Sequence, residues 1–424
     1  MLAKMKRKIT ADKKTSLALL YLFLLLISLP ITNSFTQRKD TTKREASAAG
    51  SIYYVSPTGS DSNPGTQTAP FATIQKAASV VTSGTIVYVA PGTYSFSGYI
   101  AIPSSASGTS VARTQFVSTT KWGAKVISTG SDRVWQIDGD YIDIKGFDIS
   151  NPTSTARLGI INYGSYNRAL NNYIHDVGLN NTGCPGSGGG GIDDADYTKS
   201  HNDEIGNLIV RIAAAGCSGI HGIYHANQYG VVTNNIIADI AGWGIKLYHN
   251  ASYVQAVNNT IVNAYNGVLI ETQPGYPVAD HDVVNNNIIA KSFSTSSHAI
   301  TEGSVNGNTV GSNNTINNNI LWKNANGDSV SMLANGGTIT NTIITDPKFI
   351  NGLLDGTGDY HVQTGSPAID AGTSSNAPST DFAGNTRPQG GGYDIGAYEY
   401  SSATMNTQTS VSDANFPANA NPLS

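Results

Sequence analysis

The feature that most constrains the fold is a short motif that recurs along the middle of the chain. Each copy has one or more asparagines followed by a pair of aliphatic residues, and the copies end their asparagine runs at Asn172, Asn207, Asn235, Asn259, Asn287 and Asn319. Successive copies are 35, 28, 24, 28 and 32 residues apart, a spacing typical of a structural repeat with variable loops. Because one such unit cannot bury its apolar side alone, the pattern predicts stacked coils.

A second motif runs in phase with the first, a glycine followed by an aliphatic residue. Its copies are Gly159, Gly191, Gly222, Gly244 and Gly267. Each coil is therefore expected to have a glycine-aliphatic strand and an asparagine-aliphatic strand, with Ile above Ile inside and Asn above Asn at a turn. A two-sheet sandwich also has short strands but does not explain two motifs in register. We predict an all-β, single-domain right-handed parallel β-helix, a solenoid, with an N-terminal helical cap.

The start of the chain has the pattern of an export signal. A lysine-rich leader precedes the apolar run Leu17 to Leu29, whose 13 residues fall short of the roughly 20 that span a bilayer. We predict that residues 1–34 are a signal peptide, with a retained membrane anchor as the alternative. The mature protein is then secreted or associated with the cell surface and has no stable membrane span.

The rest of the chain divides by composition. The predicted parts are a linker over 35–50, an N-terminal cap and first coils over 51–122, the parallel β-helix over 123–345, a C-terminal cap over 346–400 and a disordered tail over 401–424. The cap prediction depends on the segment FATIQKAASVV from Phe71, which has the apolar spacing of a short helix.

Charge and cysteine content exclude some partners. Charged residues are only 13 % of the chain, and without residues 1–34 it has 19 basic and 28 acidic residues, a net charge of −9. Nucleic acid is therefore not an expected partner. The two cysteines, Cys184 and Cys217, cannot build a cysteine zinc site, and they fall on loops of neighbouring coils, where they are either disulfide-bonded or free. We expect a monomer.

Alignment of the coils on the glycine motif places unlike polar residues in one row. Two positions after the glycine lie Ile161, Asp193, Tyr224, Lys246 and Leu269. If the preceding aliphatic residue points inward, these side chains point outward, and neighbouring coils lie about 4.8 Å apart. An acid, a phenol and an amine would thus be within reach of one sugar unit.

Both ends of the mature chain resemble known proteins. The segments YYVSPTGSDSNPGTQTAPFATIQKA and GTIVYVAPGTY resemble the start of secreted pectate-lyase-like β-helix proteins, particularly polysaccharide lyase family 9. The segments GSPAIDAG and DIGAYEY resemble a C-terminal module of bacterial surface and secreted β-helix proteins. The resemblance implies a polysaccharide lyase in which Lys246, in GIKL, matches the catalytic lysine of the GFKL segment. It also implies a Ca²⁺ site at Asp193, Asp194 and Asp196, where this chain has DDAD and the family has a DDGWD-like cluster.

These observations predict a secreted lyase that cleaves an acidic, uronate-containing polysaccharide by β-elimination in a groove over Gly190 to Glu271. The expected catalytic residues are Lys246, Tyr224 and His221, and the expected substrate-binding residues are His225, Trp243, His249 and Glu271. A His and Tyr pair could also act as base and acid without a metal. Zinc shared by His221 and His225 is not expected, because strand residues four apart are about 13 Å apart.

Two other functions remain open. A glycoside hydrolase on the same fold would use two carboxylates from Asp193, Asp194 and Glu271. A non-catalytic carbohydrate-binding or surface β-helix protein would bind polysaccharide without turnover, since this fold serves several functions.

Overall fold

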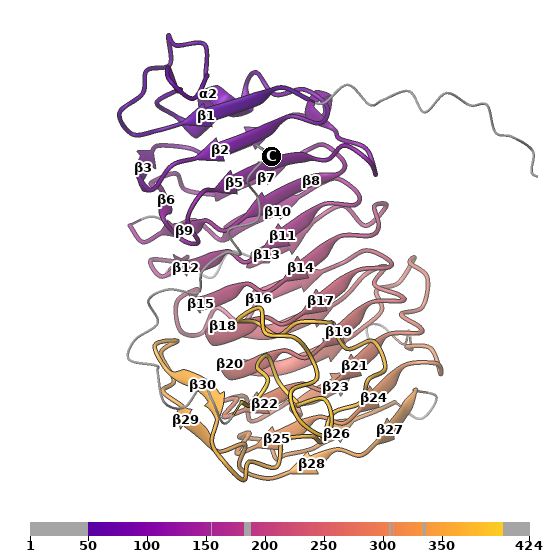
Figure 1. The fold of residues 1–424 in the computed structure, drawn as a ribbon. Coiled ribbons are helices and arrows are strands. Elements are labelled where there is room, and N and C mark those ends of the chain that lie inside the picture. The colour runs from indigo at the N-terminus through magenta and orange to yellow at the C-terminus, as the bar shows by residue number, and fades with distance from the viewer. Residues whose placement is uncertain are drawn as a thin grey trace, which may run out of the picture. The chain divides into compact units, whose positions relative to one another are not determined.

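Parallel strands wind the described chain into a solenoid (Figure 1). The computed structural model describes residues 50–153, 155–181, 188–304, 307, 309–333 and 336–401, all within one compact unit. Apart from Gly50 and Ser401, the predicted signal peptide, linker and tail lie outside these residues, so those predictions remain untested. Among the described helices, none is long and apolar enough to cross a membrane.

Within the described residues, the smaller sheet has 11 strands in chain order. They are β1 (Ile52–Val55), β2 (Ile86–Val89), β5 (Thr114–Ser118), β8 (Ile142–Lys145), β11 (Arg168–Leu170), β14 (Asp203–Ile205), β17 (Val231–Thr233), β19 (Gln255–Val257), β21 (Val283–Asn285), β24 (Thr315–Asn317) and β27 (Thr338–Thr340). Each strand pairs in parallel with the equivalent strand of the next coil.

The larger sheet, of 17 strands in the described residues, consists of two parallel ladders that meet at a corner. The first ladder, here called the side ladder, has β3 (Gly92–Phe96), β6 (Ala124–Ser128), β9 (Asp148–Asn151), β12 (Tyr173–Val177), β15 (Leu208–Ile212), β22 (Ile288–Ala290), β25 (Ile320–Trp322) and β28 (Ile343–Ile344). The second, the groove ladder, has β4 (Ile100–Ile102), β7 (Arg133–Ile137), β10 (Leu158–Asn162), β13 (Gly189–Asp194), β16 (Ile220–His225), β23 (Ile300–Glu302) and β26 (Val330–Ser331). The long strands β18 (Ile236–Leu247) and β20 (Thr260–Ile270) turn the corner and belong to both. The predicted all-β parallel solenoid is confirmed.

The repeated asparagines form a continuous hydrogen-bonded ladder inside one turn. All six predicted positions are fully buried: Asn172, Asn207, Asn235, Asn259, Asn287 and Asn319. The first five side-chain amides each donate to the side-chain oxygen of the next asparagine at 3.0 to 3.2 Å, as from Asn207 to Asn235. The side-chain oxygen of Asn235 also accepts the backbone N–H of Asn207 at 2.9 Å. The ladder thus satisfies buried polar groups at the turn in these six coils.

The repeated glycines lie in the groove-ladder strands, just after the corner with the side ladder. A Cβ added to Gly222 would lie 2.6 Å from both the Ile237 side chain and the Gly244 carbonyl oxygen, and Gly191, Gly244 and Gly267 have similar contacts. Because the backbone packs directly on the next coil there, only glycine fits without displacement. The corner also shifts the alternation of inward and outward side chains along the strand.

Aromatic rings stack along another turn of the solenoid. The ladder consists of Tyr141, Tyr166, His201, Tyr229, Tyr253 and His281, with ring centroids 4.5 to 5.0 Å apart. All six residues have φ between 56° and 62°, a left-handed conformation that non-glycine residues seldom adopt. Since the ring faces cover one another, this ladder stabilises the turn and leaves mainly ring edges to solvent.

At the N-terminal end, a five-residue helix α2 (Ile74–Ala78) lies within the segment predicted to be helical. Thr73 caps it by accepting the backbone N–H of Lys76, and its Ile74 and Ala77 are fully buried in the core. A single 3-10 turn, η1 (Ser104–Ala106), follows later. The role of α2 as a cap of the solenoid remains a prediction.

The segment 346–400 lies along the solenoid, against the outward face of the side ladder. It begins with an antiparallel pair, β29 (Phe349–Asn351) and β30 (Asp359–Val362). Its buried residues, among them Phe382 and Ile395, form one apolar cluster with strands β15, β18, β20, β22 and β25. The segment therefore covers the side-ladder face from β15 to β25, on a different side of the solenoid from the groove ladder.

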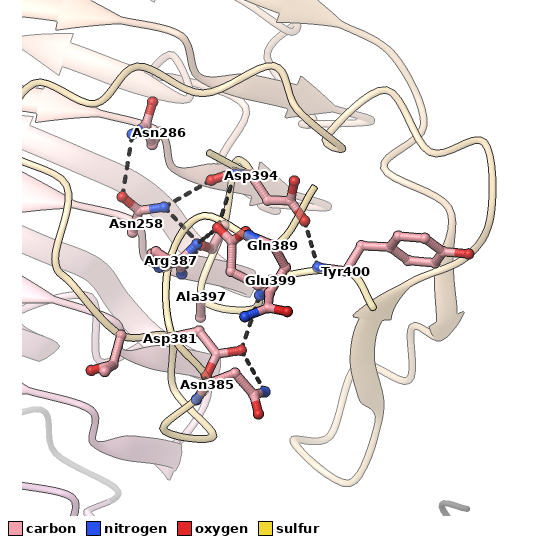
Figure 2. A network of polar contacts seen from close by, with 12 residues as sticks. Asn258, Asn286, Asp381, Asn385, Arg387, Gln389, Asp394, Ala397, Glu399 and Tyr400 are labelled. Atoms are coloured by element: carbon pink, nitrogen blue, oxygen red, sulfur yellow. Dashed lines mark hydrogen bonds and ion pairs between the residues drawn. The ribbon is translucent and has the colours of Figure 1, made fainter. Parts of the chain in front are cut away.

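Polar contacts hold this segment to the asparagine turn (Figure 2). Arg387 pairs with Glu399 at 2.5 Å, with both side chains fully buried. The Asn258 amide donates to the carbonyl oxygens of Asp394 and Gly396 at 2.9 and 3.1 Å. The residues of the DIGAYEY motif thus contribute an internal ion pair and the contacts to the solenoid.

The structure describes one of the two cysteines that were predicted to lie on loops. Cys217 is buried and disulfide-bonded, whereas Cys184 lies outside the described residues.

Candidate functional site

An open groove runs over the outward face of the groove ladder. The strand register pairs Ile161 with Asp193, Asp193 with Tyr224, and Tyr224 with Lys246, as the glycine alignment predicts. The groove has a volume of about 420 Å³ and is lined by Arg157, Leu158, Ile161, Tyr163, Gly188, Gly189, Asp193, Ala195, Tyr197, Gly219, His221, Tyr224, Lys246 and Tyr248. The predicted acid, phenol and amine therefore lie in one depression.

Lys246 lies at the end of β18 with 18 % of its side chain exposed. Its Nζ is 3.7 Å from Glu271 Oε2 and 4.1 Å from the centre of the Tyr248 ring. Burial lowers the pKa of Lys246 below the usual lysine value, although the Glu271 carboxylate opposes the shift. The groove therefore favours an amine that loses its proton more readily than a surface lysine.

Tyr224 lies between Asp193 and Lys246 in the row, and aromatic groups surround it. Its ring is parallel to that of His221 at 5.8 Å and meets Tyr248 edge to face at 6.2 Å. Burial raises the pKa of Tyr224 well above that of free tyrosine, and the nearby Tyr197 and Asp193 add to the shift. The phenol is thus protonated at neutral pH and can donate a proton or a hydrogen bond.

His221 faces the groove in a fixed protonation state. Its Nδ1 accepts the backbone N–H of Trp243 at 3.1 Å, so the proton of the neutral ring lies on Nε2. Burial lowers the pKa of His221 well below the usual histidine value, and Lys246 lowers it further. His221 is therefore a neutral ring, and Trp243 contributes to the site through its backbone.

The other end of the groove combines an acid with arginine. Asp193 is 8 % exposed, and burial together with the neighbouring Asp194 raises the pKa of Asp193 to about 7, against the opposing effect of Arg157 and Arg133. Arg157 lines the groove and pairs with Asp132 at 3.3 Å. The groove thus has one cation at each end, Arg157 and Lys246.

The three aspartates of the predicted calcium site do not converge. Asp193 points into the groove, whereas Asp194 points into the core, because neighbouring strand residues face opposite sides. Asp196 accepts the backbone N–H and the hydroxyl of Thr198 at 3.0 and 2.7 Å within its own turn. This donor set does not fit calcium, which takes six to eight oxygen ligands.

A different group of ligand-type side chains does come together. Among the residues that the structure describes, Asp194, Glu204 and His225 are the group whose ligand atoms all lie within 4.8 Å of one another. All three side chains are buried, and the group could hold a metal ion.

The four predicted substrate-binding residues differ in position. Glu271 contacts Lys246 at the end of the groove, and His249 stacks on the groove residue Tyr197 with ring centroids 3.8 Å apart. The Trp243 side chain is buried and is not among the groove-lining residues. His225 is fully buried in the core and is not among the groove-lining residues, so its binding of substrate stays a prediction. The alternation that turns Tyr224 outward turns the next residue inward.

Several groove residues were missed from the sequence. They are Arg157, Tyr163, Tyr197 and Tyr248. A signal for two of them was present, because Tyr163 and Tyr248 lie four residues after the motif glycines of their coils and so share the outward face of Ile161 and Lys246. Arg157 and Tyr197 are on connections between strands, where the repeat has no fixed length.

Comparison with known proteins supports the fold. Residues 53–207 match the family model described as the right-handed β-helix region of Pel9A-like proteins, which confirms the predicted resemblance over this part. No curated protein sequence matches the chain. The resemblance of GSPAIDAG and DIGAYEY to a C-terminal module remains a prediction.

Solved structures show the same architecture at low sequence identity. The crystal structure of pectate lyase Pel9A is 18 % identical, with a TM-score of 0.52 over 83 % of this chain and 97 % of its own. A rhamnogalacturonan lyase is 16 % identical, with a TM-score of 0.41 over 71 % and 91 % of the two chains. A glycoside hydrolase is 10 % identical, with a TM-score of 0.47 over 69 % and 96 %. The first likeness shows the fold alone, and the other two carry no argument about function.

Proposed function

We propose that this protein is a lyase that cleaves a uronate-containing polysaccharide by β-elimination, with Lys246 as the base. The observation that carries the proposal is the row Asp193, Tyr224 and Lys246, which the strand register aligns on three successive coils in one open groove. Glycan chains are extended, and a groove along stacked coils suits a substrate of that shape.

The reaction needs a base that is uncharged at neutral pH, and for a lysine amine this requires a lowered pKa. The uncharged Lys246 amine would remove the proton from the carbon next to the uronate carboxyl group. The electrons of that carbon–hydrogen bond would form the carbon–carbon double bond as the bond to the leaving oxygen breaks. The lowered pKa of Lys246, caused by burial, increases the fraction of free amine at neutral pH.

Tyr224 has the position and protonation state of the acid partner. It neighbours Lys246 in the row, and its raised pKa, caused by burial, keeps the phenol protonated until the leaving oxygen needs a proton. The neutral His221 would donate its Nε2 proton as a hydrogen bond to the substrate, since its Nδ1 is already bonded to the Trp243 backbone.

Arg157 is the group suited to the uronate carboxylate. It lines the groove on the opposite side of Asp193 from Lys246, and a guanidinium can bind a carboxylate with two parallel hydrogen bonds. Calcium would serve the same purpose in the related lyases that the sequence resembles. Since Asp193, Asp194 and Asp196 do not converge, we propose a reaction that is independent of calcium.

The decisive experiment is ultraviolet absorbance during incubation with pectate, alginate and glycosaminoglycans, with calcium or with a chelator. We expect an unsaturated product from one polymer, a loss of about a hundredfold or more in rate for Lys246→Ala and for Tyr224→Phe, and no dependence of the rate on added calcium. Lys125→Ala, an exposed lysine of β6, is the matched control. Retained activity in Lys246→Ala would refute the assignment of the base.

A glycoside hydrolase is the second candidate, favoured by one observation. Burial raises the pKa of Asp193 to about 7, which suits a general acid, while Glu271, the carboxylate at the other end of the groove, lies three coils away in the register. Release of reducing ends without ultraviolet absorbance, lost in Asp193→Asn but kept in Lys246→Ala, would establish the hydrolase and exclude the lyase. Binding without either product would favour a carbohydrate-binding protein.

The predicted leader supports a site of action outside the cell. Immunoblotting of the culture medium for a chain that lacks residues 1–34 tests this part of the proposal.

A further inference from the structure

Behind the groove, on the inner side of the same coils, lies a cluster that the proposed lyase reaction does not use. Asp194 ends β13, Glu204 lies in β14 and His225 ends β16. Their side chains are 2 %, 2 % and 0 % exposed. From these three residues we infer a structural site for one divalent first-row transition-metal ion, such as Zn²⁺ or Mn²⁺.

Two of the three donor separations match those of ligands around such an ion, and all three donor atoms lie within 4.8 Å of one another. His225 Nδ1 lies 3.0 Å from Asp194 Oδ2 and 3.2 Å from Glu204 Oε2. For bonds of about 2.1 Å, neighbouring ligands are about 3.0 Å apart in octahedral geometry and about 3.4 Å apart in tetrahedral geometry. An ion can therefore bind all three residues with little movement of their side chains.

The cluster also contains buried polar atoms without hydrogen-bond partners. Asp194 Oδ2 receives no well-aligned hydrogen bond, since its contacts are the ion pair with His225 Nδ1 at 3.0 Å and the nearby Glu204 carboxyl group, and His225 Nε2 has no partner. A buried carboxylate oxygen without a partner is unfavourable, and a bound cation would satisfy it. The other oxygen, Asp194 Oδ1, accepts the Asn162 amide at 2.8 Å, and Asn162 in turn accepts the Asn167 amide at 2.6 Å. This outer shell fixes the orientation of the carboxylate.

Charge and ligand type select the class of ion. In the deprotonated forms that bind a metal, two carboxylates and a neutral imidazole carry a charge of −2, which a divalent cation neutralises in a site that excludes water. The imidazole nitrogen favours Zn²⁺ or Fe²⁺ over Ca²⁺ and Mg²⁺, which take oxygen ligands, and the two carboxylates also suit Mn²⁺. The sequence prediction of calcium at this coil is thus replaced by a different ion held by a different set of residues.

The position of the site gives the ion a structural role. Asp193 and Tyr224, which line the groove, directly precede the ligands Asp194 and His225. An ion bound in the core would join two groove strands to Glu204 of the smaller sheet and so hold the floor of the groove in place.

The test is metal content and thermal stability of the whole protein, purified without chelator. We expect about one equivalent of transition metal per chain by mass spectrometry of the elements. Removal of the ion should lower the melting temperature, and Zn²⁺ or Mn²⁺, but not Ca²⁺ at the same concentration, should restore it. Glu204→Gln should weaken binding by at least about tenfold. Asp282→Asn, which alters a fully buried carboxylate outside the three ligands, should still bind about one equivalent of metal per chain.

Two results would overturn the inference. One is a protein that retains no ion and whose melting temperature does not respond to Zn²⁺ or Mn²⁺, which would show that protons alone hold the trio together. The other is binding by Glu204→Gln as tight as that of the wild type. If Glu204→Gln does not fold, the removal and return of the ion in the wild type decides the question. None of these measurements depends on the lyase activity.

Discussion

The asparagine ladder allows the contribution of buried hydrogen bonds to be measured in isolation. Asn259 is fully buried, and its side chain makes four hydrogen bonds. Its oxygen accepts the backbone N–H and the amide of Asn235 at 2.9 and 3.0 Å. Its amide donates to the Val232 carbonyl at 2.8 Å and to the Asn287 side chain at 3.0 Å. Replacement by alanine removes all four.

The expected cost of Asn259→Ala is about 4 kcal/mol in free energy of unfolding, at about 1 kcal/mol for each hydrogen bond. The chain also offers a control of equal size. Asn266 is fully buried too, but neither of its side-chain polar atoms has a hydrogen-bond partner. Asn266→Ala deletes the same atoms and leaves a similar cavity, so the difference between the two variants measures the hydrogen bonds.

Denaturant unfolding monitored by circular dichroism provides the comparison, with the slope of the transition checked because solenoids can unfold in stages. We expect the midpoint to fall far more for Asn259→Ala than for Asn266→Ala. Equal losses in the two variants would show that volume, not hydrogen bonding, explains the ladder.

Three further predictions follow from the charged groups. Activity should rise with pH through the lowered pKa of Lys246, and Glu271→Gln should move that rise to lower pH, because the carboxylate that raises the lysine pKa is gone; a profile that moves to higher pH would contradict this. Burial raises the pKa of Asp282 well above its usual value, so its contribution to stability is lost as pH rises; Asp282→Asn should melt higher than the wild type at pH 8 and show little gain at pH 4. Arg387→Ala leaves the buried Glu399 unpaired, which should cost about 3–5 kcal/mol, and limited proteolysis should then cut the segment 346–400 before the solenoid.

The sequence predicted the parts of the fold that repeat. The six ladder asparagines and the row of Asp193, Tyr224 and Lys246 follow from spacing alone, because every coil solves the same packing problem with the same residue types. The parts that do not repeat could not be predicted in this way. The segment 346–400 lies along the side ladder through contacts such as that of Asn258 with Asp394, which join residues 136 positions apart.

The candidate site was predicted where its residues lie on strands. Lys246 and Tyr224 face the groove, as alternation requires, but Glu204 escaped attention because it belongs to the smaller sheet and meets Asp194 and His225 only inside the core. The calcium prediction came from the resemblance of DDAD to an aspartate cluster of similar sequence. A sequence comparison of this kind does not reveal that Asp193 and Asp194 point to opposite sides of the strand.

The repeated glycines of the groove ladder link the packing of the coils to the geometry of the groove. A methyl group on Gly222 would lie 2.6 Å from the Gly244 carbonyl oxygen, so Gly222→Ala must push apart the two coils that carry Tyr224 and Lys246. Overpacking of this kind costs about 1–3 kcal/mol, and we expect a further loss of at least about tenfold in kcat/KM, because reacting groups tolerate little displacement. Gly219→Ala is the matched control, since an added Cβ there has no atom within 4 Å although Gly219 also lines the groove. If the two variants lost activity equally, the close packing at Gly222 would not be what keeps Tyr224 and Lys246 in register.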